Sequence, residues 1–109
     1  MHDRLTPEFA TAALQAAGRE FVTLFEHGTL AVEFYRPVGV DKQIPHNRDE
    51  IYVVVTGSGF FRCGDQRREF GPGEVLFAPA GVEHRFEEFS GDFATWVFFY
   101  GPEGGEAAK

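Results

Sequence analysis

The chain has 109 residues and a mass of 12.2 kDa, which allows one domain with one hydrophobic core. Hydrophobic residues make up 43% of the sequence, and this content excludes a disordered chain. Seventeen acidic residues against 10 Lys and Arg give a net charge of −7, which argues against a nucleic-acid partner. No stretch has the length of a membrane span and no signal peptide is visible, so we expect a cytoplasmic protein without a membrane partner.

One short helix is predicted near the N-terminus, over Glu8–Ala17. Thr6 is a favourable N-cap residue, and Pro7 suits the first helical turn. The helix is rich in alanine, and Gly18 is a natural stop. We expect residues 1–18 to pack as a helical cap on the rest of the domain.

The following residues, 19–100, have the pattern of an all-β domain. Runs of β-branched and aromatic residues alternate with turns that contain Gly, Pro or Asp, at a spacing of about 8 to 12 residues. This pattern is typical of a β-sandwich or β-barrel. The expected strands are Glu20–Glu26, Thr29–Arg36, Ile51–Thr56, Phe60–Cys63, Gln66–Phe70, Glu74–Ala78, Val82–Phe89 and Phe93–Tyr100.

The last predicted strand and the tail lead to two further expectations. Thr95–Tyr100 (TWVFFY) is apolar on both faces, whereas a strand covered on one side should alternate. A second cover is therefore expected, either the helix or a second subunit, and we predict a homodimer. Residues 101–109 have no apolar anchor, so a flexible tail is predicted.

The segment Gly73–Glu88 (GEVLFAPAGVEHRFEE) carries four spaced residues that form a specific pattern, namely Gly73, Pro79, Gly81 and His84. This spacing resembles the second motif of the cupin superfamily, which continues with an asparagine where this chain has Glu88. The resemblance implies a cupin, or jelly-roll-like, β-barrel. Pro79 and the glycines suit the turns of such a fold, since turns require fixed or positive φ.

The segment Pro45–Gly59 (PHNRDEIYVVVTGSG) resembles the first cupin motif, with His46, Glu50 and Gly57 at the family spacing. The family places another histidine at the position that Ile44 occupies here. The resemblance therefore implies a metal site with one imidazole fewer than the full set. The missing ligand should weaken metal binding and lower the selectivity between metals.

The resemblance implies a divalent-metal site inside the barrel, built from His46, Glu50 and His84. Two imidazoles and one carboxylate suit a divalent transition metal and leave coordination positions open for substrate or oxygen. Iron(II) is the first expectation, with zinc, manganese or nickel as alternatives. Without a metal, His46 and Glu50 would simply share a hydrogen bond across a loop.

Two polar residues near these motifs have open roles. Gln43 is either a weak fourth ligand, turned inward by a bulge at Pro45, or a surface glutamine whose place at the metal is taken by water. Glu88 is either a general base near the mouth of the barrel or a solvated side chain.

A substrate pocket is predicted from strand parity. Tyr52 and Val54 share a face with Glu50, and Phe86 shares a face with His84. Aromatic residues of the last strand, Trp96 and Phe98, are expected to close this pocket, although core packing explains the same pattern. Cys63, His2 and His27 are interpreted as structural residues.

Among functions, the resemblance implies a metal-dependent enzyme for a small organic molecule, similar to non-haem iron dioxygenases or to cupin isomerases, decarboxylases and lyases. The alternative is a non-catalytic module that binds or senses a small ligand. The fold does not decide between them.

Overall fold

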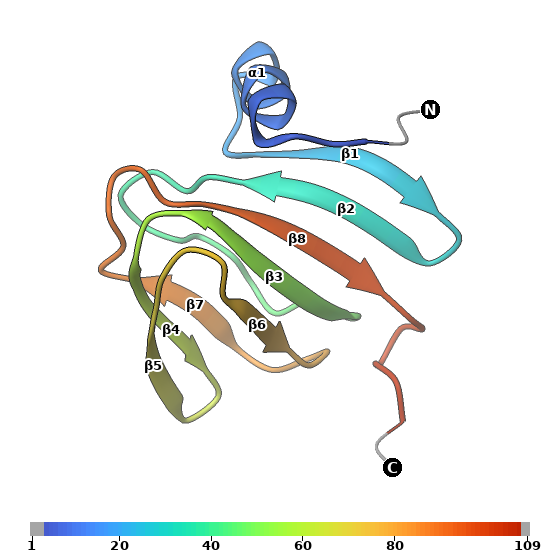
Figure 1. Cartoon of the computed structure of the whole chain (residues 1–109). Coiled ribbons are helices and arrows are strands. Elements are labelled where there is room, and N and C mark those ends of the chain that lie inside the picture. The colour runs from blue at the N-terminus through green and yellow to red at the C-terminus, as the bar shows by residue number, and fades with distance from the viewer. Residues whose placement is uncertain (1–3, 108–109) are drawn as a thin grey trace.

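The computed structural model describes residues 4–107 and contains all of the predicted elements, with each end shifted by at most two residues (Figure 1). The elements are α1 (Pro7–Ala17), β1 (Phe21–His27), β2 (Leu30–Tyr35), β3 (Asp49–Thr56), β4 (Gly59–Cys63), β5 (Gln66–Phe70), β6 (Val75–Ala78), β7 (His84–Glu87) and β8 (Ala94–Tyr100). In residues 4–107, no helix is long and apolar enough to cross a membrane.

Helix α1 begins and ends where the sequence predicts. The Thr6 hydroxyl accepts a hydrogen bond from the Phe9 backbone N–H at 3.1 Å, which satisfies one of the free donors of the first turn. Gly18 has a φ of 65°, and its N–H donates to the carbonyls of the last turn. Glycine adopts this left-handed conformation without strain, and for this reason it commonly follows the last residue of a helix.

The strands form two antiparallel sheets, of order β1-β2-β8-β3-β6 and β5-β4-β7. The sheets face each other and enclose a core rich in aromatic rings, including Tyr52, Phe61, Phe86 and Phe93. The predicted all-β, jelly-roll-like fold is confirmed. In the described strands the hydrogen-bonded ladders form two sheets rather than one closed ring.

The two faces of β8 have different covers. Val97 and Phe99 belong to the core between the sheets, whereas Trp96 packs against Phe34 at a centroid distance of 5.0 Å. Helix α1 lies over this outer face of the larger sheet, and Leu14 joins the same cluster (Figure 1). The helix therefore supplies at least part of the second cover that the sequence requires.

The prediction that Trp96 and Phe98 line the pocket is wrong. Because successive side chains on a strand point to opposite faces, the inward positions of Val97 and Phe99 direct Trp96 and Phe98 outward. Nothing in the sequence indicates which residues of this strand face inward, since both of its faces are apolar and aromatic.

The segment after β8 is hydrogen-bonded to the rest of the domain. The Gly104 N–H donates to the Asn47 carbonyl at 2.6 Å, and the Glu106 N–H donates to Asp49 Oδ2 at 2.8 Å. These bonds connect the segment as far as Glu106 to the residues around the start of β3, and the flexibility of the tail remains a prediction. Residues 108–109 lie outside the described residues.

The homodimer remains a prediction. On the outer face of the edge strand β6, Val75 is 66% exposed and Phe77 is 48% exposed, and helix α1 covers another part of the sheet. We expect light scattering to give twice the 12.2 kDa mass of the chain. Phe77→Glu should shift the protein to a monomer, because a charge cannot be buried cheaply in an apolar interface.

The matched control is Val38→Glu in a loop, where the side chain is 70% exposed and a new charge should leave the dimer intact. A wild-type protein that is monomeric at all concentrations used would contradict the prediction.

Candidate metal centre

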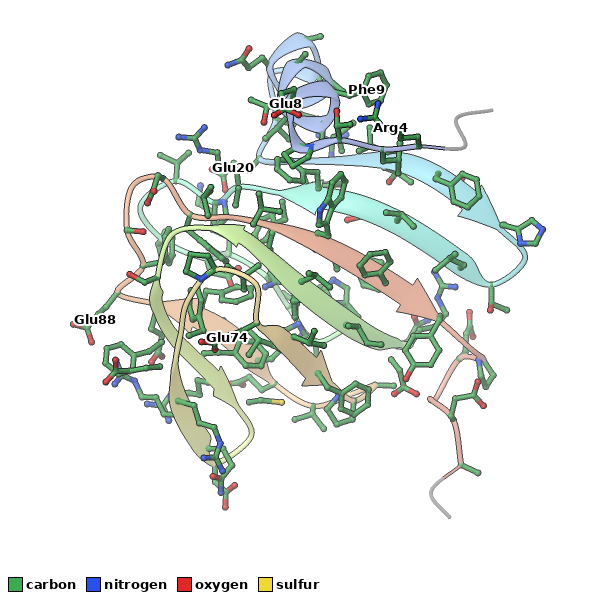
Figure 2. The ribbon with its side chains drawn as sticks, viewed as in Figure 1. Arg4, Glu8, Phe9, Glu20, Glu74 and Glu88 are labelled. Carbon is green, nitrogen blue, oxygen red and sulfur yellow. The ribbon has the colours of Figure 1, made fainter. Side chains whose placement is uncertain are left out.

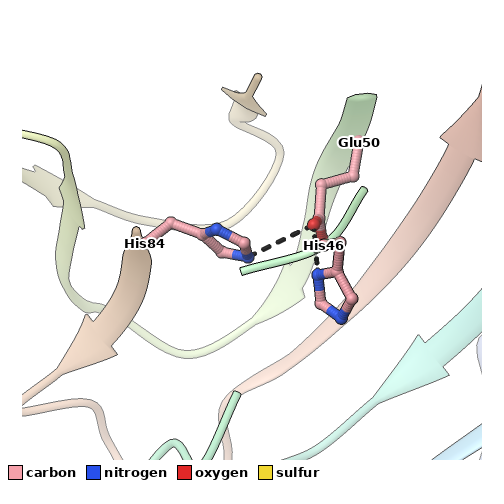
Figure 3. Close-up of side chains that lie close together, drawn as sticks. All are labelled: His46, Glu50 and His84. Atoms are coloured by element: carbon pink, nitrogen blue, oxygen red, sulfur yellow. Dashed lines mark hydrogen bonds and ion pairs between the residues drawn. The ribbon is translucent and has the colours of Figure 1, made fainter. Parts of the chain in front are cut away.

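Three side chains converge between the two sheets (Figure 3). His46 lies in the loop before β3, Glu50 on β3 of the larger sheet and His84 at the start of β7 in the smaller one. One potential ligand atom from each residue lies within 4.8 Å of the others. The convergence predicted from the two motifs is therefore observed.

His84 is oriented by its backbone contact. Its Nδ1 lies 2.9 Å from the Val82 carbonyl, and since a carbonyl can only accept, Nδ1 carries the proton. The other nitrogen, Nε2, lies 3.2 Å from Glu50 Oε2 and is a buried polar atom without a hydrogen-bond partner in residues 4–107. A neutral Nε2 and a carboxylate oxygen would repel each other at this distance, so a positive charge is required between them.

His46 supplies a second imidazole on the same carboxylate oxygen. Its Nδ1 lies 2.6 Å from Glu50 Oε2, and its ring is tilted against that of His84 at a centroid distance of 5.5 Å. Two imidazoles and one carboxylate oxygen are a donor set that suits a divalent transition metal. The residues present therefore fit such an ion, and the unpartnered nitrogen of His84 is the observation that supports the fit.

The second oxygen of Glu50 is held by a phenol. Tyr52 donates to Glu50 Oε1 at 2.5 Å, and the same hydroxyl lies 3.0 Å from Gln43 Oε1. Tyr52 is fully buried, so this contact fixes the carboxylate and leaves Oε2 facing the imidazoles. Outer contacts of this kind orient metal ligands in many proteins.

Gln43 is turned inward, but toward the phenol. Its amide nitrogen donates to Asp41 Oδ2 at 2.8 Å while its oxygen faces Tyr52. The interpretation as a surface glutamine is therefore wrong, and its described contacts place it behind Glu50 rather than among the imidazoles. Ile44, at the position of the missing family histidine, is 72% exposed.

Asp41 is a residue that sequence reasoning missed. It is fully buried and accepts hydrogen bonds from the Tyr35 hydroxyl at 2.6 Å and from the Phe86 N–H at 2.8 Å. It also accepts from the backbone and side-chain nitrogens of Gln43. Asp41 thereby fastens the loop before β3 to both sheets. A lone aspartate between Val40 and Lys42 carries no sequence signal for this, because most loop aspartates are solvated.

The charges of the cluster follow from its contacts. Burial raises the pKa of Glu50, but its hydrogen bonds with His46 and Tyr52 and its close contact with His84 outweigh it and lower the pKa to about 2. Burial lowers the pKa of His84, yet the close contact with the Glu50 carboxylate and the hydrogen bond to the Val82 carbonyl leave the pKa raised. The position between these two side chains thus favours a positive charge, which either a proton or a metal ion can supply.

A cavity of about 630 Å³ adjoins the cluster. Its lining combines His46 with inward-facing residues of β1, β2 and β8, and includes Glu33, Tyr35, Val97 and Phe99. The predicted pocket residues Tyr52, Val54 and Phe86 point inward as expected, but they pack in the closed core beside this space. The cavity therefore lies under β1, β2 and β8, whereas the sequence indicated β3, β7 and β8.

The structure contradicts the prediction that Glu88 is a general base near the mouth of the barrel. Its side chain is 73% exposed, pairs with Arg67 at 2.6 Å and projects from the edge of the molecule (Figure 2). Strand β7 ends at Glu87, and Glu88 has a φ of 48°, so the alternation that would have turned it toward His84 is broken.

Cys63 and His27, which we interpret as structural, have no part in the cluster. Cys63 is half-buried and packs against the core, and its thiol is free. His27 stacks near Phe25 in the β1–β2 hairpin, at a centroid distance of 6.4 Å. His2 lies outside the described residues.

Fold, motif spacing and site together define a small cupin barrel with a His-Glu-His cluster. Residues 31–100 match the family described as the Cupin domain, and the chain belongs to this family. An uncharacterized protein of Streptomyces coelicolor is 40% identical over 63 residues, a match that spans 58% of this chain and 60% of that protein. The match therefore covers less than two thirds of the relative's length.

Solved structures share the fold. A Cupin 2 conserved barrel domain protein from Salinispora arenicola superposes with a TM-score of 0.63 at 19% identity, covering 74% of each chain. A protein from Ralstonia eutropha, provisionally named a mannose-6-phosphate isomerase, gives a TM-score of 0.57 at 26% identity, covering 75% of this chain and 83% of its own.

Removal of the Tyr52 hydroxyl tests the support of Glu50. Tyr52→Phe should weaken divalent-metal binding by about 10- to 100-fold, because an unsupported carboxylate loses its fixed orientation. Titration with cobalt(II), followed by its visible spectrum, measures the change. Tyr100→Phe removes a hydroxyl outside the cluster and should bind as the wild type does. Equal affinity of the two variants would contradict the role of Tyr52.

Metal binding should strengthen as the pH rises, because His84 must lose its proton to bind. The pKa of His84 is raised, so in the metal-free protein its protonated form adds stability below about pH 6.5 that is lost as the pH rises through the folded-state pKa. Glu50 stays ionised throughout this range.

The gain in Tm on adding a divalent metal should therefore grow between about pH 6 and pH 8. Differential scanning fluorimetry at several pH values measures it. A gain that is constant with pH, or that persists unchanged in His84→Gln, would contradict the assignment.

Proposed function

We propose that this protein is a metal-dependent cupin enzyme that acts on a small organic molecule, with His46, Glu50 and His84 holding a divalent ion. The observation that carries the proposal is the buried, unpartnered Nε2 of His84, which faces a carboxylate oxygen already shared with His46. Two imidazoles and a carboxylate form the facial donor set of non-haem iron(II) oxygenases, so iron(II) is the proposed ion. Zinc, manganese and nickel accept the same donors.

A divalent ion held here would supply a Lewis acid and a template for substrate. The chain's own residues do the rest. Tyr52 holds Glu50 in one orientation, and His46 lies on the boundary between cluster and cavity. Val97 and Phe99 give the cavity an apolar wall, which limits water around a small, partly apolar substrate.

Two reaction classes follow from this arrangement. The three-donor set favours a dioxygenase-like reaction, because it leaves coordination positions for both oxygen and substrate. The name of the Ralstonia eutropha neighbour supports an isomerase- or lyase-like reaction, which needs no oxygen. Consumption of oxygen separates the two.

Metal content is the first test. Protein purified without a polyhistidine tag should carry close to one divalent ion per chain by elemental analysis. His84→Ala and Glu50→Gln should each fall below roughly a tenth of that content, since losing a ligand costs more than losing an outer contact. His27→Ala, in the exposed hairpin, is the matched control and should keep its ion. Metal content unaffected by either ligand substitution would refute the site.

Activity is the second test. Iron(II)-loaded protein should consume oxygen with at least one member of a panel of small organic acids and catechols, and Glu50→Gln should abolish this uptake. Turnover without oxygen uptake would favour the isomerase or lyase reaction. Tight binding of small acids with no turnover would favour a non-catalytic binding module.

A further inference from the structure

A second carboxylate enters the cavity beside the cluster. Glu33 lies on β2 with its side chain half-buried, and it lines the cavity together with His46. The Thr23 hydroxyl on β1 donates to Glu33 Oε2 at 3.1 Å. Within residues 4–107, no lysine or arginine forms an ion pair with Glu33. Its negative charge is thus directed into the cavity with a single neutral donor.

The cationic residues around the same cavity are engaged elsewhere. Lys42 lies 4.0 Å from Glu20. Arg48 donates to a backbone carbonyl, and Arg19 lies 4.3 Å from the centroid of an aromatic ring. The charges of His46 and Arg19 lower the pKa of Glu33 from a distance, but within residues 4–107 neither forms an ion pair with it, so a donor that enters from solvent can still bind to the carboxylate.

The surroundings of Glu33 favour a hydrogen-bond donor. Burial and the nearby charge of Glu50 raise the pKa of the Glu33 carboxyl, and the bond from Thr23 together with the charges of His46 and Arg19 offsets this only in part. A carboxylate that has lost part of its hydration is stabilised by an ammonium or hydroxyl group, through a charge-assisted hydrogen bond.

The register of the sheet sets the distance to the metal cluster. Glu33 pairs with Val97 on β8, and Val97 pairs with Tyr52 on β3, one inward-facing step from Glu50. Standard strand spacings then separate the backbones of Glu33 and Glu50 by about 12 Å. Both side chains project from the inner face of the sheet, so their carboxylates lie roughly as far apart as the backbones. Two metal–oxygen bonds take about 4 Å of this distance and a hydrogen bond to Glu33 takes about 3 Å, which leaves about 5 Å, the span of about four bonds.

We propose that Glu33 recognises the far end of the substrate. The substrate class is a small acid that meets the cluster with its acid end and presents an ammonium or hydroxyl group to Glu33 about four atoms away. This inference rests on the proposed function, because the cluster must hold the other end. Thr23 keeps the Glu33 carboxylate in position to receive that donor.

Three isosteric probes test the proposal. Ornithine, 5-hydroxynorvaline and norleucine share one chelating head and one chain length, and they end in ammonium, hydroxyl and methyl. With cobalt(II)-loaded protein, spectral titration should give dissociation constants at least about tenfold lower for ornithine and 5-hydroxynorvaline than for norleucine. Glu33→Gln should retain cobalt and lose that preference. Glu26→Gln, an exposed carboxylate of the same cavity, should keep it.

Each other outcome overturns the proposal. Equal affinity for the three probes, absence of binding by cobalt-loaded protein, or an unchanged preference in Glu33→Gln would show that Glu33 does not select the ligand, with the metal site left standing. A protein that takes up no cobalt would contradict both this proposal and the proposed function.

Discussion

The buried carboxylate of Glu50 is the group around which the interior is organised. A charged oxygen pair in a small core of aromatic rings costs several kcal/mol unless each oxygen has partners. Tyr52 takes one oxygen, and the two imidazoles share the other. Without the carboxylate, the phenol of Tyr52 loses its acceptor and the buried Nε2 of His84 loses the negative charge that it faces. The contacts that compensate the charge of Glu50 are therefore the same contacts that set the geometry of the site.

The same constraint joins the two sheets. Glu50 belongs to the larger sheet and His84 to the smaller one, so the packing between the sheets sets their separation. Close packing at the end of β3 contributes to this. A Cβ at Gly57, which has a φ of 87°, would lie 2.5 Å from the Phe93 backbone, so only glycine fits. Core residues far from the cluster thus act on its geometry through the distance between the sheets.

The features that sequence predicted are those with local signatures. Caps at Thr6 and Gly18, turn residues between strands, and the spacing of the two motifs all act over a few residues, and they gave the elements and the converging trio. The predictions that failed concern features that depend on tertiary packing. The parity of Trp96 had no local signal, because both faces of its strand are apolar.

Long-range contacts explain the other omissions. Asp41 is buried only because β2 and β7 both supply donors to it, and Glu33 meets the cavity only because β2 lies beside β8. The reverse error occurred at Glu88, where a local rule was extended past the end of its strand. Strand alternation is reliable only inside the strand.

Asp49 has a consequence for how variants of this protein are interpreted. Its carboxylate accepts hydrogen bonds from the Ala80 N–H, two residues after β6 ends, and from the Glu106 N–H in the segment after β8. The neighbouring residue on the same strand is Glu50, which faces the opposite way. An aspartate that never touches the cluster therefore anchors the backbone on both sides of it. If an Asp49 variant lost metal, the cause would be a displaced backbone around the cluster and not the loss of a ligand.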